Sequence, residues 1–221
     1  MRDALLARLH THLHSLLPSA RLRPQALPQL PSVSLWLMDD LMREQALEPA
    51  VINALMDAPP YWSFCWASGQ VLGAWLRDHP QWVAGRTVVD VGSGSGVVAI
   101  AAAQAGAARV IACDVDPLAR VAVSLNAAHN GVTVELSDDL EQCLALADCV
   151  TAADILYDRD NLGLLARFRA GARKPAVMLA DSRIPDLNPD GYTRLGQQQA
   201  LTWPDLGESR EFNQVRLFQA G

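Results

Sequence analysis

Short apolar runs rich in β-branched residues alternate with stretches of helical periodicity between residues 87 and 181. Continuous apolar runs are typical of strands buried on both faces, and helices between such strands join them in parallel. The alternation therefore predicts a doubly wound α/β fold with a mostly parallel sheet. The predicted strands cover residues 87–91, 109–114, 132–136, 149–154 and 176–181.

The last fifth of the chain has a different pattern. Residues 193–204 and 213–221 are typical of two strands, and no helical stretch separates them, so they are predicted to form an antiparallel pair. Together, the two patterns predict a seven-stranded, Rossmann-like sheet that ends in a C-terminal hairpin. The predicted helices cover residues 70–77, 95–107, 117–130, 140–146 and 161–169.

Residues 1–57 precede this pattern and are predicted to form an N-terminal helical extension, a cap or a substrate-docking element. Leucines at helical spacing predict a first helix, three prolines predict an extended connector over 20–34, and a second helical pattern covers 40–56. His10 and His14 lie one helical turn apart, but no third metal ligand is nearby, so surface histidines are expected.

Composition narrows the class of protein. A formal net charge of -6 and a pI of about 5.3 disfavour a nucleic-acid partner, which needs a clustered basic face. The four cysteines form no C-x-x-C pair, which favours a reduced, cytoplasmic chain without a bound metal. The apolar run 97–103 is too short to span a bilayer. The alternative location is the mitochondrial matrix, if the source is eukaryotic and the first helix is a transit peptide.

The stretch VVDVGSGSG at residues 88–96 places glycines 92, 94 and 96 directly after a predicted strand. A dinucleotide fingerprint, G-x-G-x-x-G, would place its third glycine at Val97. The loop therefore matches the fingerprint of a dinucleotide-binding site, such as one for NAD, only in part. A turn into a helix would by itself need only one or two of these glycines.

A carboxylate follows every predicted parallel strand, and in such a sheet the ligand lies beyond the carboxyl ends of the strands. Asp114 is placed to accept hydrogen bonds from both hydroxyls of a ribose, whereas Asp116 precedes Pro117 and is expected to cap a helix. An acidic rim would repel a pyrophosphate, but it suits the ammonium and sulfonium of S-adenosylmethionine. The methyl donor is therefore favoured over NAD.

Three stretches in order, VVDVGSGSG, VIACDVDP and AADILYD, resemble the signatures of class I S-adenosylmethionine-dependent methyltransferases. PPYWSFCWASGQVLGAWL and LTWPDL narrow the resemblance to the electron transfer flavoprotein beta-subunit lysine methyltransferase family and its bacterial nicotinamide N-methyltransferase-like relatives. The resemblance implies a methyltransferase domain over 58–221, S-adenosylhomocysteine as product, and a protein lysine as acceptor. A small-molecule amine acceptor and a donor-binding protein without turnover are the alternatives.

The resemblance also implies roles for single residues around the donor. The glycine loop would approach the methionine part, with Asp90 beneath it, and Asp114 would hold the ribose. Asp139, preferred over Asp138, would reach the adenine amine. The donor-binding residues implied in this way are Trp66, Gly69, Asp90, Gly92, Ser93, Gly94, Gly96, Asp114, Asp139 and Leu140.

On the acceptor side, the resemblance implies Asp154 and Tyr157 as the catalytic residues. Asp154 would hold the acceptor ammonium, orient it and accept a proton, and Tyr157 would form an aromatic wall. The structural alternatives are a helix cap for Asp154 and a core anchor for Trp66. WASGQ and ADSRIPDL depart from the family pattern, and in the second stretch Arg183 either points into the site or pairs with Asp181.

Overall fold

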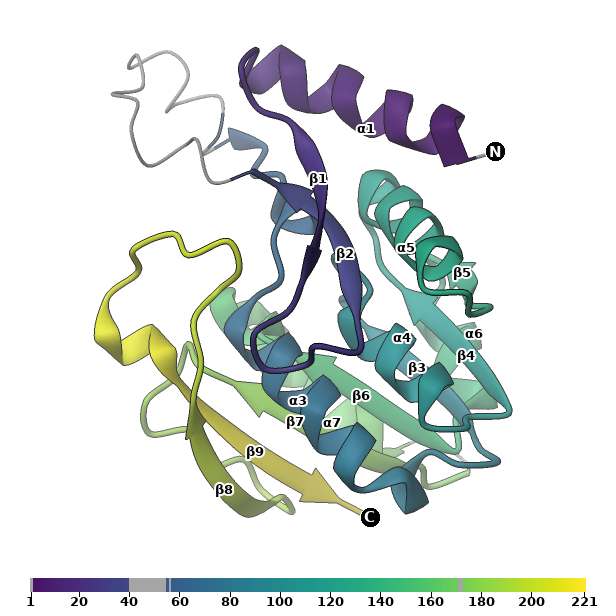
Figure 1. Cartoon of the computed structure of the whole chain (residues 1–221). Helices are drawn as coiled ribbons and strands as arrows, with labels where there is room; N and C mark the ends of the chain where they lie inside the picture. Colours follow the sequence, from purple (N-terminus) through teal and green to yellow (C-terminus); the bar gives the residue numbers. More distant parts are fainter. Residues whose placement is uncertain (1, 40–54, 56, 171–172) are drawn as a thin grey trace.

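The computed structural model describes residues 2–39, 55, 57–170 and 173–221. Its central sheet has seven strands in the order β5-β4-β3-β6-β7-β9-β8 (Figure 1). Neighbouring strands from β5 to β7 are parallel, and β9 runs antiparallel to both β7 and β8, which confirms the predicted fold class. The strands are β3 (Thr87–Val91), β4 (Arg109–Cys113), β5 (Glu135–Ser137), β6 (Cys149–Ala153), β7 (Ala176–Asp181), β8 (Thr193–Gln199) and β9 (Gln214–Ala220).

One strand differs from its prediction. The apolar run 132–136 predicted a strand, but β5 pairs with β4 only over Glu135–Ser137. Val132 and Val134 instead pack against the core from the segment that leads into this edge strand. The apolar residues therefore belong to the connecting segment, which packs against the core, and not to the residues that pair in the sheet.

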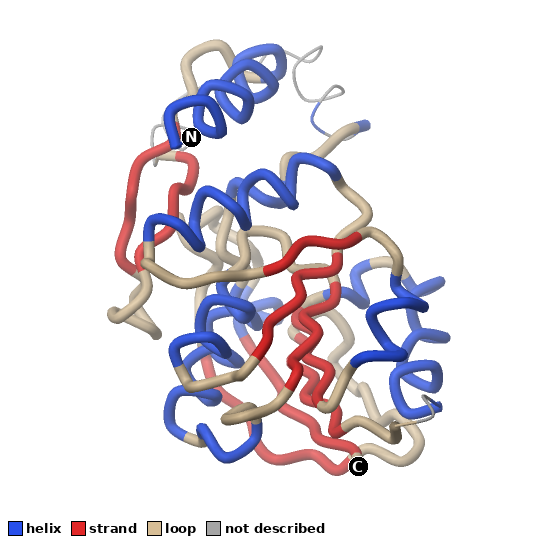
Figure 2. The backbone as a smooth tube through the Cα atoms, turned by 90° about the vertical axis from the view of Figure 1, so that its right-hand side faces the viewer, coloured by secondary structure: helices blue, strands red, loops and turns tan. Residues whose placement is uncertain are grey.

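Helices cover both faces of the sheet (Figure 2). On one face, α3 (Ala67–Asp78) and α4 (Val97–Gln104) share a core with the sheet and with part of α5 (Pro117–His129). On the other face lie α6 (Leu140–Leu146) and α7 (Leu162–Ala170). The other described helix, α1 (Arg2–Leu16), is outside these layers.

The N-terminal segment packs on α5. Here β1 (Leu22–Ala26) and β2 (Ser34–Met38) form an antiparallel hairpin where the sequence predicted an extended connector (Figure 1). Buried residues of α1, β2 and α5 form a third apolar cluster, so the hairpin is held by side chains that face α5. The helical pattern predicted over 40–56 lies, apart from residue 55, outside the described residues.

His10 and His14 are not free surface side chains, which corrects the prediction. The backbone N–H of Leu22 donates to His10 Nε2 over 3.0 Å, and His14 Nε2 lies 2.9 Å from the carbonyl oxygen of Ala20. Both rings thus tie α1 to the segment that enters β1. No helix within the described ranges has both the length and the apolar character needed to cross a membrane.

Candidate active site

The loop between β3 and α4 depends on glycine backbone conformations. Gly92, Gly94 and Gly96 have φ of 66°, 52° and 86°, a region that side-chain-bearing residues rarely adopt. A Cβ at Gly92 would also lie 2.7 Å from Ile155 Cγ2. These residues therefore hold an open backbone loop at the carboxyl end of β3.

Asp114, at the end of β4, fixes this loop. Its Oδ2 accepts a hydrogen bond from the N–H of Gly94, and its Oδ1 accepts one from the N–H of Asp116, both over 2.9 Å. Burial raises the pKa of Asp114, and the two backbone hydrogen bonds act in the opposite direction. Each carboxylate oxygen keeps a second lone pair, so the group can still accept hydrogen bonds from a ligand.

Asp90 lies beneath the loop and is almost completely buried. Its Oδ1 accepts a hydrogen bond from Thr151 Oγ1 over 2.8 Å, whereas its Oδ2 is buried and has no hydrogen-bond partner among the residues that the structure describes. Burial raises the pKa of Asp90 to about 7. The Ser93 hydroxyl donates to the Asp90 carbonyl over 2.7 Å, which ties the loop to its own strand.

Two further carboxylates cap helices. Asp116 accepts a hydrogen bond from the N–H of Leu118 and caps α5, as the sequence predicted. Asp139 caps α6 by accepting one from the N–H of Gln142 over 3.0 Å, which leaves one of its oxygens available. Its neighbour Asp138 pairs with Arg120 at 3.1 Å. The preference for Asp139 as the partner of the adenine amine stays a prediction. Leu140, which is partly buried beside the core, is predicted to pack on the adenine ring.

Asp154, directly after β6, has a left-handed backbone, with φ of 52°, and is buried. Its Oδ1 accepts hydrogen bonds from the hydroxyl of Ser68 at 2.6 Å and from the N–H and hydroxyl of Ser182 at 2.9 and 2.8 Å. Its Oδ2 accepts a fourth from the N–H of Ser68 at 3.0 Å. Four donors on one carboxylate join the ends of β6 and β7 to the start of α3.

An aromatic group lies beside Asp154. The ring centroid of Tyr61 is 5.1 Å from that of Tyr157 and 5.6 Å from that of Trp66, whose Nε1 donates to the Tyr61 carbonyl. Tyr157 is 58% exposed, and partial desolvation raises the pKa of its hydroxyl. Tyr61, Trp66 and Tyr157 thus present aromatic faces at the carboxyl edge of the sheet. The sequence analysis did not single out Tyr61.

Gly69, one of the predicted donor-binding residues, lies on the buried side of α3. A Cβ there would lie 2.7 Å from Val97 Cγ1, so the close approach of α3 to α4 requires a glycine. This packing accounts for the residue without a ligand. Its contact with a donor stays a prediction.

Arg183 points into the site, which is the first of the two predicted alternatives. Its Nε lies 3.9 Å from Asp154 Oδ1, and its side chain also pairs with Glu208 at 2.8 Å, whereas only its backbone N–H donates to Asp181 Oδ1. The guanidinium carbon lies 5.1 Å from the Trp66 ring centroid and 4.9 Å from that of Phe212. Arg183 therefore joins the loop after β7 to the segment between β8 and β9, and contacts the predicted donor-binding residue Trp66.

Comparisons with known proteins agree with this geometry. Residues 75–159 match the family model of ribosomal protein L11 methyltransferase (PrmA). The chain is 39% identical over 104 residues to the mouse electron transfer flavoprotein beta subunit lysine methyltransferase, with 46% of this chain and 41% of the relative covered. It is 44% identical over 104 residues to the ribosomal protein L11 methyltransferase of Pelotomaculum thermopropionicum, covering 45% of this chain and 33% of the relative.

The fold is shared with a solved structure. The ribosomal protein L11 methylase from Lactobacillus delbrueckii subsp. bulgaricus superposes with a TM-score of 0.50 and 24% identity, over 69% of this chain and 77% of that chain. The chain has the class I methyltransferase fold. In sequence it resembles the two methyltransferase groups above, which confirms the predicted resemblance. It spans less than half the length of the curated relatives it matches.

Several residues that organise this methyltransferase fold were missed in the sequence. Thr151 and Asn126 are buried polar residues inside a strand and a helix, where local pattern gives no signal of a partner. Ser68 and Ser182 lie in WASGQ and ADSRIPDL, the two stretches that depart from the family pattern. Those departures were a signal, although their common partner, Asp154, was visible only in three dimensions.

Proposed function

We propose that this chain is an S-adenosylmethionine-dependent methyltransferase that transfers a methyl group to a lysine amine of a protein. The observation that carries the proposal is the loop held open by the Gly94–Asp114 hydrogen bond, above the unpartnered Oδ2 of Asp90. The names of the relatives, a lysine methyltransferase and ribosomal protein L11 methyltransferases, support methyl transfer and a protein acceptor.

The residues fit this donor better than a dinucleotide. Asp90 offers a buried carboxylate oxygen that lacks a partner, which suits an ammonium group, directly or through a water. Asp114 keeps lone pairs for a ribose, and the open backbone of the glycine loop lets a ligand approach closely. The bound donor supplies an electrophilic methyl group on a sulfonium. Trp66, Gly69, Asp139 and Leu140 remain proposed donor contacts.

Acceptor positioning is assigned to the aromatic group and Asp154. The lysine amine would attack the methyl group of the bound donor in its neutral form, after its proton has passed to solvent. The faces of Tyr61, Trp66 and Tyr157 favour the positive charge that develops on its nitrogen during transfer, by cation–π attraction. Asp154 already accepts four hydrogen bonds, so we assign it the role of a positioning residue that fixes the surrounding loops, in place of the proton acceptor expected from the sequence. The aromatic walls would then align the acceptor and keep water out.

Titration calorimetry with S-adenosylmethionine and with NAD tests the donor. We expect binding of the methyl donor and no measurable response to NAD. The reverse result would overturn the proposal.

A location in the cytoplasm fits the four cysteines, which are all free and buried, because a reducing compartment keeps thiols unpaired.

Labelling a lysate of the source organism with tritiated donor tests the acceptor, with recombinant electron transfer flavoprotein beta subunit and ribosomal protein L11 as defined probes. A labelled protein, with the label on a lysine by mass spectrometry, supports the proposal. Label found only in small molecules would instead support a small-molecule N-methyltransferase. Donor binding with no labelled product at all would support a donor-binding protein without turnover.

A further inference from the structure

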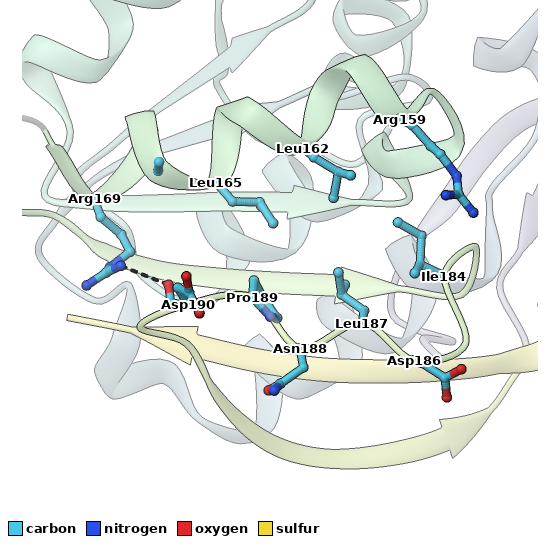
Figure 3. Close-up of a pocket in the computed structure, with 11 residues that line it drawn as sticks. Arg159, Leu162, Leu165, Arg169, Ile184, Asp186, Leu187, Asn188, Pro189 and Asp190 are labelled. Carbon is cyan, nitrogen blue, oxygen red and sulfur yellow. Dashed lines mark hydrogen bonds between the residues drawn. The ribbon is translucent and has the colours of Figure 1, made fainter.

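A groove lies between α7 and the loop that follows β7 (Figure 3). Its volume is about 460 Å³, within the range typical of ligand sites. Leu162 and Leu165 reach into it from α7, and Ile184, Leu187 and Pro189 face them from the loop. Arg159 lies at one end and Arg169 at the other.

The groove exists because the connection after β7 is not helical. Each earlier parallel strand from β3 to β6 is followed by a helix, but residues 182–192 join β7 to β8 without one. The loop is fixed at its far end, where Arg169 donates to the Asp190 carbonyl and the Tyr192 hydroxyl donates to the Leu165 carbonyl, both over 2.9 Å. The two walls of the groove are therefore joined at its far end.

The apolar lining is not fully covered by the chain itself. Leu165 is buried against the sheet, but Leu162 is 40% exposed, and Ile184 and Leu187 are only partly buried. An exposed leucine beside partly buried apolar side chains offers a surface that a partner's apolar side chain can cover.

Arg159 supplies a free charge at the near end. Across residues 2–39, 55, 57–170 and 173–221, its side chain makes no hydrogen bond or ion pair, even with Asp186 on the facing loop. Arg169, in contrast, is bonded to Asp190 and stacked 5.9 Å from the Tyr192 ring centroid. The Arg159 guanidinium is thus available to pair with an anionic group, on the wall opposite Asp186.

The near end also adjoins the proposed acceptor site. Arg159 follows Tyr157 by two residues, and Ile184 follows Ser182, a hydrogen-bond partner of Asp154, by two residues. The groove therefore starts beside the proposed site of transfer and runs along α7 to Arg169. The ten-residue step from Arg159 to Arg169 spans about 15 Å at the helical rise per residue, enough for roughly four extended residues.

We propose that this groove binds the segment of the protein acceptor that flanks the methylated lysine. Its occupant is an extended peptide with a large apolar side chain on Leu162, Ile184 and Leu187, and an acidic side chain paired with Arg159. The inference rests on the proposed protein acceptor and adds to it the sequence that the enzyme selects.

A degenerate peptide library with one fixed central lysine, incubated with tritiated donor, tests the groove. We expect the wild type to enrich an acidic residue at one position and a large apolar residue at another, on the same side of the lysine. Arg159→Glu is expected to exchange the acidic preference for a basic one, and Leu162→Ser to reduce the apolar preference several-fold.

The matched controls are Leu195→Ser and Arg8→Glu. Leu195, on β8, is 39% exposed and does not line the groove, and Arg8 is an exposed arginine of α1. Both are expected to keep the wild-type preferences, and all four variants are expected to bind the donor as the wild type does.

Two results would overturn the proposal that the groove binds the acceptor peptide: labelling of peptides without any enrichment, or the same enrichment with Arg159→Glu as with the wild type. Either result would leave the proposal of a protein acceptor standing. Donor binding with methylation of small amines and of no peptide would overturn both proposals. These outcomes separate failure of the groove from failure of the proposed function.

Discussion

The backbone N–H of Gly94 donates a hydrogen bond to Asp114 Oδ2 over 2.9 Å, so the end of β4 holds the loop that follows β3. The two strands are parallel neighbours, with Val91 paired to Cys113. A single carboxylate thus shapes the loop and still has lone pairs that can meet a ligand.

Asp114→Ala is expected to weaken binding of S-adenosylmethionine by roughly tenfold to a hundredfold, because it removes a charged hydrogen-bond acceptor from the loop. Calorimetry measures the change. Asp116→Ala is the control, since it removes only the cap of α5, at a cost of about 1 kcal/mol in stability, and should leave donor affinity within about twofold. Equal losses of affinity in the two variants would contradict this division of roles.

Asp154→Asn is expected to lower turnover and to reduce the free energy of unfolding by about 3 kcal/mol, because the charge is lost and an amide NH₂ at the Oδ2 position would face the N–H donor of Ser68. Steady-state kinetics and urea denaturation measure the two effects. Ser182→Ala keeps the backbone hydrogen bond and should cost only about 1 kcal/mol. If Asp154→Asn weakened donor binding as much as Asp114→Ala, the assignment of Asp154 to the acceptor side would fail.

The sheet could be predicted from the sequence because its strands and helices differ in apolar period, and the carboxyl-edge residues followed from strand direction. Contacts between distant segments could not. Ser68 meets Asp154 from 86 residues away, and no local pattern reports such a pair. The hairpin was also missed, because Pro24 and its neighbouring prolines indicated a connector, whereas β1 is an edge strand in which a proline is tolerated.

Tyr157→Ala is expected to lower turnover at least tenfold and Tyr157→Phe by less than about threefold, if the ring, and not the hydroxyl, contributes by cation–π attraction. The raised pKa of the Tyr157 hydroxyl keeps it protonated near neutral pH, so it is not expected to act as a base. Single-turnover measurements at saturating donor separate this effect from binding. Equal loss in both variants would show that the hydroxyl is required.

Asn126 links the N-terminal hairpin to the glycine loop: its Oδ1 accepts from the N–H of Trp36 at 2.7 Å, and its Nδ2 donates to the Ser95 carbonyl at 2.9 Å. Asn126→Ala should reduce stability by about 2 kcal/mol and also weaken donor binding. Asn130→Ala is the matched control, because Asn130 makes two hydrogen bonds to Ser34 of the same hairpin and one to the Asn126 carbonyl, but, among the described residues, none to the loop. It should lose stability without losing donor affinity. Urea denaturation and calorimetry measure both quantities, and parallel losses of affinity would disprove the link.

Asp90→Asn is expected to flatten the dependence of stability on pH. Burial raises the pKa of Asp90 from 3.8 to about 7, so between these values the folded state binds the extra proton and the wild type loses stability as pH rises, by up to roughly 1.4 kcal/mol per pH unit. Above about pH 7 the carboxylate is ionised in both states and the slope ends. Asp181, whose pKa is raised by burial to about 6, adds a similar slope at lower pH and keeps it in the variant. The free energy of unfolding of Asp90→Asn minus that of the wild type should therefore increase from pH 5 to pH 8 in urea denaturation.

Donor affinity should behave oppositely: in the wild type it strengthens as Asp90 ionises, and in Asp90→Asn it is weaker and loses this rise. A difference in unfolding free energy that stays constant with pH would show that Asp90 titrates normally in the folded protein.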